Sequence, residues 1–164
     1  MGMEIERKFT IKSLPSNLED YDRHIISQAY LCENPTVRIR RQDDVYYMTY
    51  KKKGLMAHEE YNLDLTKEGF DHLLTKADGN VIKKTRYLIP IDNPKFSADY
   101  VTPDDLQLVI ELDVLDAPFA PLIMAEVEFP DEACANAYIP EDWFEADVTN
   151  DRKYYNSNMV YSNF

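Results

Sequence analysis

Pairs of like charges, placed two residues apart, are the feature of this sequence that suggests chemistry. In chain order the pairs are Glu4/Glu6, Arg38/Arg40, Lys51/Lys53, Lys84/Arg86, Glu111/Asp113 and Glu126/Glu128, and Lys8 follows the first of them. Carboxylates are the ligands that hard divalent cations prefer, and arginine and lysine neutralise phosphate oxygens. Phosphoryl transfer requires both, so the pattern matches the needs of a metal-assisted reaction of this kind.

The side chains of each pair share one face of a predicted strand, because alternate residues of a strand point the same way. In a β-sandwich these charged faces would meet water. In a closed barrel they would line the interior around a polyanion and its metal, while the apolar faces meet helices outside. Like charges at i and i+2 repel each other unless a ligand or an opposite ion holds them, which favours the barrel.

The proposed inner face is nearly neutral, although the chain carries a net charge of −12. Its seven cations are Lys8, Arg38, Arg40, Lys51, Lys53, Lys84 and Arg86, and its eight acids are Glu4, Glu6, Glu60, Asp64, Glu111, Asp113, Glu126 and Glu128. Most of the negative charge therefore lies elsewhere. It argues against general nucleic-acid binding, but it leaves room for a small polyanionic ligand.

Short strands dominate the expected secondary structure, separated by turn-prone pairs such as Asn34-Pro35 and Lys53-Gly54. Period-two patterning predicts strands over 3–11, 24–32, 36–42, 45–53, 58–65, 80–89, 95–101, 106–115 and 121–129. One helix should begin after Thr66 as N-cap, present Phe70, Leu73, Leu74 and Ala77 on one face, and stop at Gly79. Further helical turns are expected over Glu132–Tyr138, near Leu14–Tyr21 and near Asp151–Met159.

Length and composition predict a single domain covering residues 1–164, without repeats or linkers. No apolar run reaches the ~20 residues of a membrane span, and the charged Met1–Thr10 is unlike a signal peptide. We therefore expect a cytoplasmic protein that does not bind membranes. Cys32 and Cys134 lack C-x-x-C spacing and are expected to be reduced, partly buried thiols.

Several other chemistries lack their motifs. The chain has no G-x-x-x-x-G-K-[ST] phosphate loop and no G-x-G-x-x-G. His24, His58 and His72 show no metal-ligand spacing, so surface or strand-filling roles are expected for them.

The segment Glu4-Ile5-Glu6-Arg7-Lys8 resembles the E-x-E-x-K signature of the CYTH domain, the triphosphate tunnel metalloenzymes. Its order is matched by later segments across about residues 3–160: Arg38-Ile39-Arg40, Thr49-Tyr50-Lys51, Glu60-Tyr61-Asn62, Lys84-Thr85-Arg86, Glu111-Leu112-Asp113, Glu126-Val127-Glu128-Phe129 and the tail Asp147-Val148-Thr149 with Tyr154 and Asn156. The resemblance implies a mainly β, α+β fold: an eight-stranded antiparallel closed barrel, or tunnel, with a charged interior and a few flanking helices.

The resemblance also implies site roles around one or two Mg²⁺ or Mn²⁺ ions. The metal ligands would be Glu4, Glu6, Glu126 and Glu128, assisted by Glu111 and Asp113, with Glu60 as a further candidate. The phosphates would be held by Lys8, Arg38, Arg40, Lys51, Lys84 and Arg86, with Lys53 either inside the barrel or already in the turn. Tyr30, with Lys8, is a candidate to position the attacking water, and packing alone is the alternative for Tyr30.

The sequence departs from the family pattern at three positions. His58 and Asn62 stand where a basic residue and a second glutamate are common, which places any metal role there in doubt. Pro121-Leu122 replaces the usual glycine-leucine step before the last acidic strand.

Within the family the substrates differ. A compact chain without an evident base pocket favours inorganic triphosphate, cleaved to pyrophosphate and phosphate by in-line attack of water. The alternatives are a thiamine triphosphatase, a class IV adenylate cyclase, or a non-catalytic barrel that binds polyphosphate or a nucleotide. The expected partner is a small triphosphate; the oligomeric state stays open, and a homodimer is compatible with the sequence.

Overall fold

The computed structural model describes residues 2–53 and 56–162. Its strands are β1 (Gly2–Ile11), β2 (Arg23–Cys32), β3 (Thr36–Gln42), β4 (Val45–Lys51), β5 (Ala57–Asp64), β6 (Asp78–Ile91), β7 (Lys95–Phe96), β8 (Leu108–Leu115), β9 (Ile123–Glu128), β10 (Tyr138–Ile139) and β11 (Phe144–Asp147). Its helices are α1 (Lys67–Leu74), α2 (Glu132–Ala137) and α3 (Asn156–Met159), with 3₁₀ turns η1 (Leu18–Asp20) and η2 (Arg152–Tyr154).

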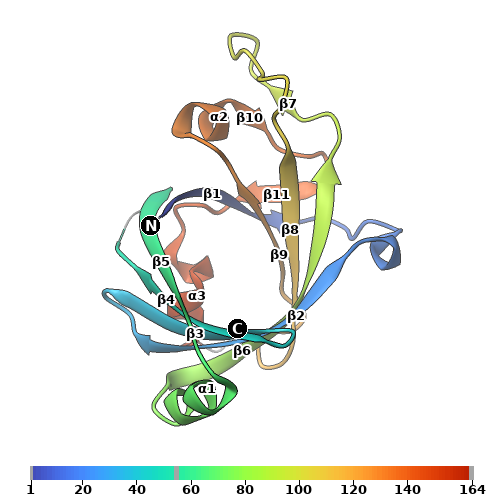
Figure 1. Cartoon of the computed structure of the whole chain (residues 1–164). Helices are drawn as coiled ribbons and strands as arrows, with labels where there is room; N and C mark the ends of the chain where they lie inside the picture. The colour runs from blue at the N-terminus through green and yellow to red at the C-terminus, as the bar shows by residue number, and fades with distance from the viewer. Residues whose placement is uncertain (1, 54–55, 163–164) are drawn as a thin grey trace.

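Eight of these strands close into an antiparallel barrel, seen end-on in Figure 1. Around the barrel the strands follow the order β1-β5-β4-β3-β2-β6-β8-β9, and β9 pairs back onto β1. The closing pair sets Lys8 opposite Glu126 and Glu6 opposite Glu128. The predicted closed barrel is thereby confirmed, and the sandwich alternative is wrong.

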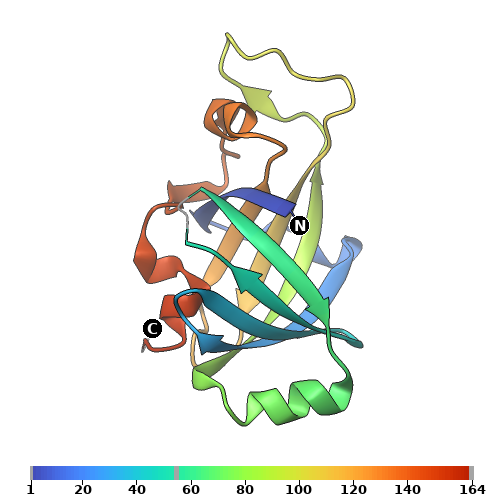
Figure 2. The same cartoon turned by 60° about the vertical axis from the view of Figure 1, so that its left-hand side comes forward.

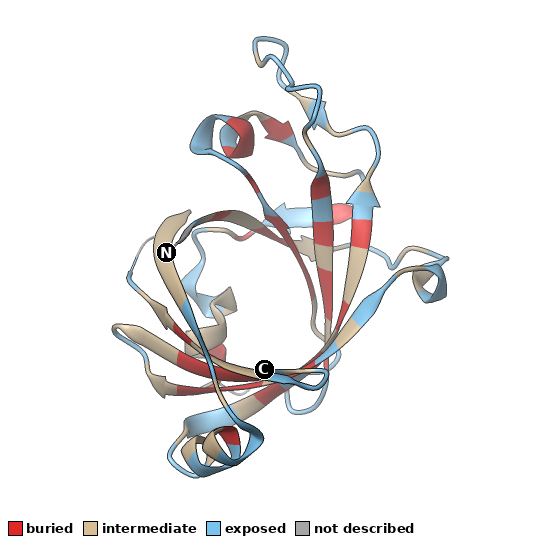
Figure 3. Cartoon of the chain, in the orientation of Figure 1, coloured by how far each residue is buried: buried red, intermediate tan, exposed pale blue. Residues whose placement is uncertain are grey.

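Apolar side chains cover the outside of the barrel, as the alternation of residues predicts. Under α1, Phe70 packs on Ala29 and Ile39, whose strand neighbours Arg38 and Arg40 point inward. A larger cluster lies between α2, β11 and the outer faces of β1, β8 and β9. Figure 3 shows buried residues along the barrel strands and within α1 and α2. Burial of these faces fixes the register, and with it the inward charges.

A third apolar cluster lies at one end of the barrel interior. Inward-facing residues of four strands pack together there: Tyr30, Ile82, Leu115 and Met124. They lie in one cluster with Phe119 of the β8–β9 connection and with Val148, Met159 and Val160 of the chain after β11. Figure 2 shows this C-terminal segment, with η2 and α3, passing along the side of the barrel. The barrel interior is therefore polar in its middle and apolar at this end.

The helix after Thr66 is confirmed, with the Thr66 side chain accepting a hydrogen bond from the Gly69 amide at 3.0 Å. The stop at Gly79 is wrong, because the helix ends at Leu74 and Gly79 lies within β6. Gly79 has φ +66°, and a Cβ there would lie 2.5 Å from the Val160 carbonyl oxygen. This glycine therefore permits close approach of the C-terminal segment to β6.

Several predicted boundaries also change. The strand expected over 95–101 shortens to β7, which pairs with the unpredicted β10 outside the barrel. The strand over 45–53 ends at Lys51, and that over 121–129 begins at Ile123, after Pro121, which has no amide hydrogen to donate. The predicted turn at Lys53-Gly54 extends into residues outside the described ranges. Helical turns near the other predicted positions are found as η1, α2, η2 and α3.

No helix within residues 2–53 and 56–162 is both long enough and apolar enough to cross a membrane. Cys32 and Cys134 are both free thiols, as expected.

Candidate active site

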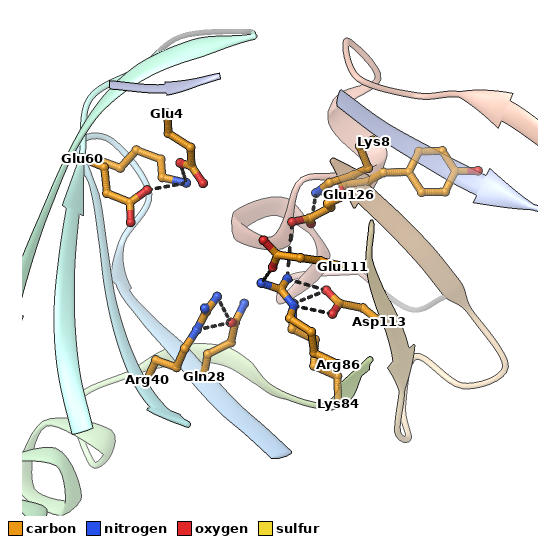
Figure 4. Close-up of polar contacts among 12 residues, drawn as sticks. Glu4, Lys8, Gln28, Arg40, Glu60, Lys84, Arg86, Glu111, Asp113 and Glu126 are labelled. Carbon is orange, nitrogen blue, oxygen red and sulfur yellow. Dashed lines mark hydrogen bonds and ion pairs between the residues drawn. The ribbon is translucent and has the colours of Figure 1, made fainter. Parts of the chain in front are cut away.

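The barrel encloses a cavity of about 440 Å³. Strand residues and the C-terminal segment line it together, and Glu6, Lys8, Tyr30, Arg38, Lys51, His58 and Arg152 are among them. Figure 4 shows three groups of polar side chains facing one another across this interior. Each group has a different balance of charge, and this balance indicates what it can bind.

The first group is the arginine pair, Arg38 and Arg40 on β3. Both guanidinium groups are buried, with 8% and 7% of the residue exposed, and neither forms an ion pair with a carboxylate of the described residues. Arg40 donates twice to the Gln28 side-chain oxygen, at 3.0 and 2.7 Å, and Arg38 donates to the Thr49 hydroxyl at 3.1 Å. Two adjacent buried cations with neutral partners make a strong anion site.

Electrostatics agree with this assignment. Burial lowers the pKa of Arg40, and the charges of Arg38 and Arg86 lower it further. Burial also lowers the pKa of Arg38, but Tyr30, Tyr47, Glu60 and Glu4 more than offset this and raise it. Both arginines stay protonated, so the less compensated positive charge is that of Arg40. A bound polyanion would offset the free-energy cost of burying this positive charge.

The second group is the ion-pair cluster, Lys84 and Arg86 with Asp113. Asp113 is 2% exposed; its Oδ1 accepts from Arg86 Nε at 2.7 Å and its Oδ2 from Lys84 Nζ at 2.6 Å. Arg86 also pairs with Glu111 and, at 3.4 Å, with Glu126. Burial raises the pKa of Asp113, but Arg86 and Lys84 more than offset this and hold it below its ordinary value. These cations are largely neutralised.

The third group is the carboxylate cluster around Glu4 and Glu6. Lys51 Nζ lies 2.7 Å from Glu4 Oε2 and 3.7 Å from Glu60 Oε2. Burial raises the pKa of Glu6 to about 8, and the negative charges of Glu126 and Glu4 add to the shift. The site therefore disfavours the ionised form of both Glu4 and Glu6 as long as no cation lies beside them.

Glu126 and Glu128 complete the acidic side from β9. Lys8 Nζ bridges Glu126 Oε1 at 3.2 Å and the Tyr154 carbonyl oxygen at 3.1 Å. Burial opposes ionisation of Glu126, but Lys8, Arg86 and Lys84 hold its pKa well below the ordinary range. The pKa of Glu128 is raised, first by burial and then by Glu4 and other acids. The two residues are thus unequal, and Glu128 has the greater need of a cation.

Of the predicted inner-face residues, most lie together and a few do not. Asp64 is exposed at the far end of β5, opposite Tyr47. Lys53 follows the end of β4 and still borders the cavity. Tyr30 is 3% exposed, borders the cavity and also packs in the apolar cluster at the barrel end.

Sequence reasoning missed three kinds of site residue. His58 lies opposite Glu4 in the β1–β5 pairing and brings its Nε2 to 3.8 Å from Glu4 Oε2. Gln28 and Thr49 orient the arginine pair. Arg152, in η2, reaches the cavity from the C-terminal segment. Gln28, Thr49 and His58 lie at alternate positions in step with the inward-facing residues of their strands, and this pattern could have identified them. For Arg152 the sequence offers no such signal.

The residues present fit a divalent cation. Ligand atoms of Glu4, Glu6 and His58 all lie within 4.8 Å of one another, and the two carboxylates supply the hard oxygen donors that Mg²⁺ and Mn²⁺ take. Burial raises the pKa of both side chains; Glu60 adds to the shift of Glu4, and the charges of Glu126 and Glu4 add to that of Glu6. A bound cation would favour the ionised form of both carboxylates and so offset the cost of burying them.

Known proteins resemble this chain in sequence and in fold. The inorganic triphosphatase of Nitrosomonas europaea is 34% identical over 97% of both chains, and that of Acetivibrio thermocellus is 31% identical over 100% of this chain and 99% of its own. A crystal structure of an inorganic triphosphatase superposes with a TM-score of 0.66 at 32% identity, covering 99% of this chain and 97% of that one.

No profile of a known protein family matches the chain. The two relatives nevertheless match the chain over almost their whole length, and the solved triphosphatase shares its barrel. The order of charged strands is the one that the E-x-E-x-K signature predicts. The chain therefore belongs to the inorganic triphosphatase family, whose barrel is the CYTH triphosphate tunnel domain.

Proposed function

We propose that this barrel hydrolyses inorganic triphosphate to pyrophosphate and phosphate with the help of a divalent metal ion. The observation that carries the proposal is a buried arginine pair, without an ion-pair partner among the carboxylates of the described residues, in the same barrel interior as the carboxylate cluster. Relatives named inorganic triphosphatase support the choice of substrate.

The arginine pair would bind the phosphate chain. Gln28 and Thr49 hold the two guanidinium groups in place through neutral acceptors, so the charge of each arginine remains for the ligand. Such preorganised cations stabilise the negative charge that phosphoryl transfer spreads over the phosphate oxygens, and they do so without rearranging during the reaction.

The metal would be held by Glu4 and Glu6, with Glu128 and Glu126 on the neighbouring strand. Such an ion, when bound, neutralises phosphate oxygens and orients the attacking water. Glu126 is already paired with Lys8 and Arg86, so Glu128 is the freer of the two β9 acids.

Lys8 and Tyr30 are our candidates for positioning the water. Lys8 Nζ is fixed between Glu126 and the Tyr154 carbonyl, at the border between the acidic and basic groups. The Tyr30 hydroxyl accepts from Gln28 Nε2 at a long 3.5 Å, which leaves it a weakly held partner next to the same cavity.

Asp113 takes a different role in this proposal from the metal-assisting one suggested by the resemblance. Both of its oxygens accept hydrogen bonds from Lys84 and Arg86. We assign it to holding those two cations at a fixed spacing, as a positioning residue.

The test is phosphate release from tripolyphosphate, thiamine triphosphate and ATP in parallel, each with Mg²⁺, Mn²⁺ or EDTA. We expect tripolyphosphate to be hydrolysed fastest, with one pyrophosphate formed for each phosphate, and EDTA to abolish the reaction. Absence of hydrolysis with every metal, despite tripolyphosphate binding, would indicate a binding protein. Formation of cyclic AMP from ATP would indicate a cyclase.

Variants test the assignment of the carboxylates. Glu6→Gln should lose turnover while tripolyphosphate still binds to the arginine pair. Glu68→Gln, at an exposed position of α1, is the matched control and should retain full activity. Undiminished hydrolysis by Glu6→Gln would contradict the metal assignment.

A further inference from the structure

We infer that His58 is a nitrogen ligand of the metal site, and that it shifts the site's preference from Mg²⁺ toward a first-row transition ion such as Mn²⁺. The inference rests on the metal site of the proposed function, but on a residue that the family resemblance does not assign to metal. It concerns which ion the cavity takes.

The position of His58 is set by strand pairing. β1 and β5 are antiparallel, and their register places His58 directly opposite Glu4. Facing residues of neighbouring strands have side chains on the same side of the sheet, so the imidazole must point into the barrel with the carboxylate. Its side chain is 11% exposed, and the residue borders the cavity together with Glu6.

The spacing of the donor atoms suits one ion. Ligand atoms on a cation with bonds of about 2.1 Å lie about 3 Å apart when adjacent and about 4.2 Å apart when opposite. His58 Nε2 is 3.8 Å from Glu4 Oε2, and donor atoms of Glu4, Glu6 and His58 all lie within 4.8 Å of one another. These separations are close to those between ligand atoms on one cation.

The donor set decides the selectivity. Mg²⁺ prefers oxygen donors and gains little from an imidazole, whereas transition ions accept imidazole readily and bind N/O sites in the order Mn²⁺ < Fe²⁺ < Co²⁺ < Ni²⁺. Two carboxylates alone would not discriminate strongly. One imidazole added to them favours Mn²⁺ over Mg²⁺.

Lys51 is the competing partner for Glu4, at 2.7 Å from the same Oε2. It has a second acceptor in Glu60 at 3.7 Å, toward which it can move when the cation arrives.

The experiment is pulsed electron paramagnetic resonance of the full chain loaded with Mn²⁺ in a nitrogen-free buffer. We expect ¹⁴N modulation from a directly bound imidazole in the native protein, and its loss in His58→Gln. In parallel, the signal of free Mn²⁺ during titration gives the Mn²⁺ affinity. The Mn²⁺ affinity should weaken at least about tenfold in His58→Gln, because the loss of even a residue that only orients a metal ligand costs that much. The Mg²⁺ affinity should change far less.

His72→Gln is the matched control, because His72 lies at an exposed position of α1 outside the barrel. It should keep both the ¹⁴N modulation and the Mn²⁺ affinity. A circular dichroism melt of each variant shows that it is folded, and His58→Asn provides a second variant if the glutamine disturbs the site.

Absence of ¹⁴N modulation in the Mn²⁺-loaded native protein would overturn the inference, as would equal loss of Mn²⁺ and Mg²⁺ affinity in His58→Gln. Either result is separable from a failure of the proposed function. Tripolyphosphate hydrolysis without nitrogen coupling rejects His58 alone; nitrogen coupling without hydrolysis of any triphosphate rejects the enzyme and leaves the metal site.

Discussion

The arginine pair and the ion-pair cluster are built from the same kinds of cation and face the same interior, yet they are held in opposite ways. Arg38 and Arg40 have neutral partners, an amide and a hydroxyl. Lys84 and Arg86 share the carboxylate of Asp113. The first arrangement leaves charge for a ligand at a cost in stability; the second secures geometry and leaves less charge. A basic residue that faces the tunnel is therefore not necessarily available to bind the substrate, because a neighbouring carboxylate can neutralise it.

The largest effect should follow from breaking the ion-pair cluster. Asp113→Asn leaves Lys84 and Arg86 buried with one carboxylate fewer, and removing one partner of a buried pair typically costs about 3–5 kcal/mol. We expect a loss of this size in the free energy of unfolding, measured by urea denaturation. Asp71→Asn removes an exposed carboxylate paired with Lys67 and should cost less than about 1 kcal/mol. Equal costs at the two positions would contradict the distinction.

The opposite result is expected at the arginine pair. Arg40→Gln removes a buried charge that has no carboxylate partner among the described residues, so the free energy of unfolding should change by no more than about 1 kcal/mol. Tripolyphosphate hydrolysis, however, should fall about 100-fold, the usual effect of losing one preorganised group that stabilises the transition state. Steady-state kinetics and urea denaturation on the same preparation check both halves. A strongly destabilised but catalytically normal variant would reverse our assignment.

The pH dependence of stability separates the two sides of the cavity further. In the metal-free protein the pKa of Glu6 is raised to about 8, so the folded state binds a proton that the unfolded state releases near pH 4.5. Stability from this group is therefore fully present below pH 4.5 and is lost as the pH rises to about 8. We expect the melting temperature to fall over this range and the fall to become smaller in Glu6→Gln.

Asp113 and Glu126 contribute a pH dependence of stability of the opposite sign, because their pKa values are lowered in the folded protein. Their contribution is present above pH 4.5 and is lost on acidification. Adding Mn²⁺ should raise the melting temperature more at pH 8 than at pH 5, since protons and metal compete for the carboxylate cluster. A metal effect independent of pH would contradict the placement of the cation at Glu4 and Glu6.

Sequence reasoning reached the barrel because period-two charge patterns are local, and a closed barrel is the one arrangement that brings the charged faces of all these strands together. It could not say which cation is neutralised. Arg86 and Asp113 are 27 residues apart in sequence, and only the β6–β8 register brings them into contact. His58 shows no metal-ligand spacing along the chain, because its partner Glu4 lies across a strand pair. Arg152 enters from a segment without periodicity.

The smallest effect we predict sharpens the comparison at a single hydrogen bond. Thr49 is 1% exposed; its hydroxyl accepts from Arg38 at 3.1 Å and donates to Asn62 at 2.6 Å. Thr49→Val keeps the shape of the side chain but removes the acceptor that orients Arg38. Since the charge of Arg38 is retained and only its orientation is loosened, we expect KM for tripolyphosphate to rise about threefold to tenfold, equivalent to one neutral hydrogen bond of about 1 kcal/mol, with kcat nearly unchanged.

Thr36→Val is the matched control, because Thr36 borders the cavity but its hydroxyl donates to the Glu33 carbonyl rather than to an arginine. Its KM should stay at the native value. If Thr49→Val lowered kcat as strongly as Arg40→Gln, orientation and charge would contribute equally at the arginine pair. The arginine pair and the ion-pair cluster would then differ in how firmly their cations are oriented, and not in how much positive charge they present to the substrate.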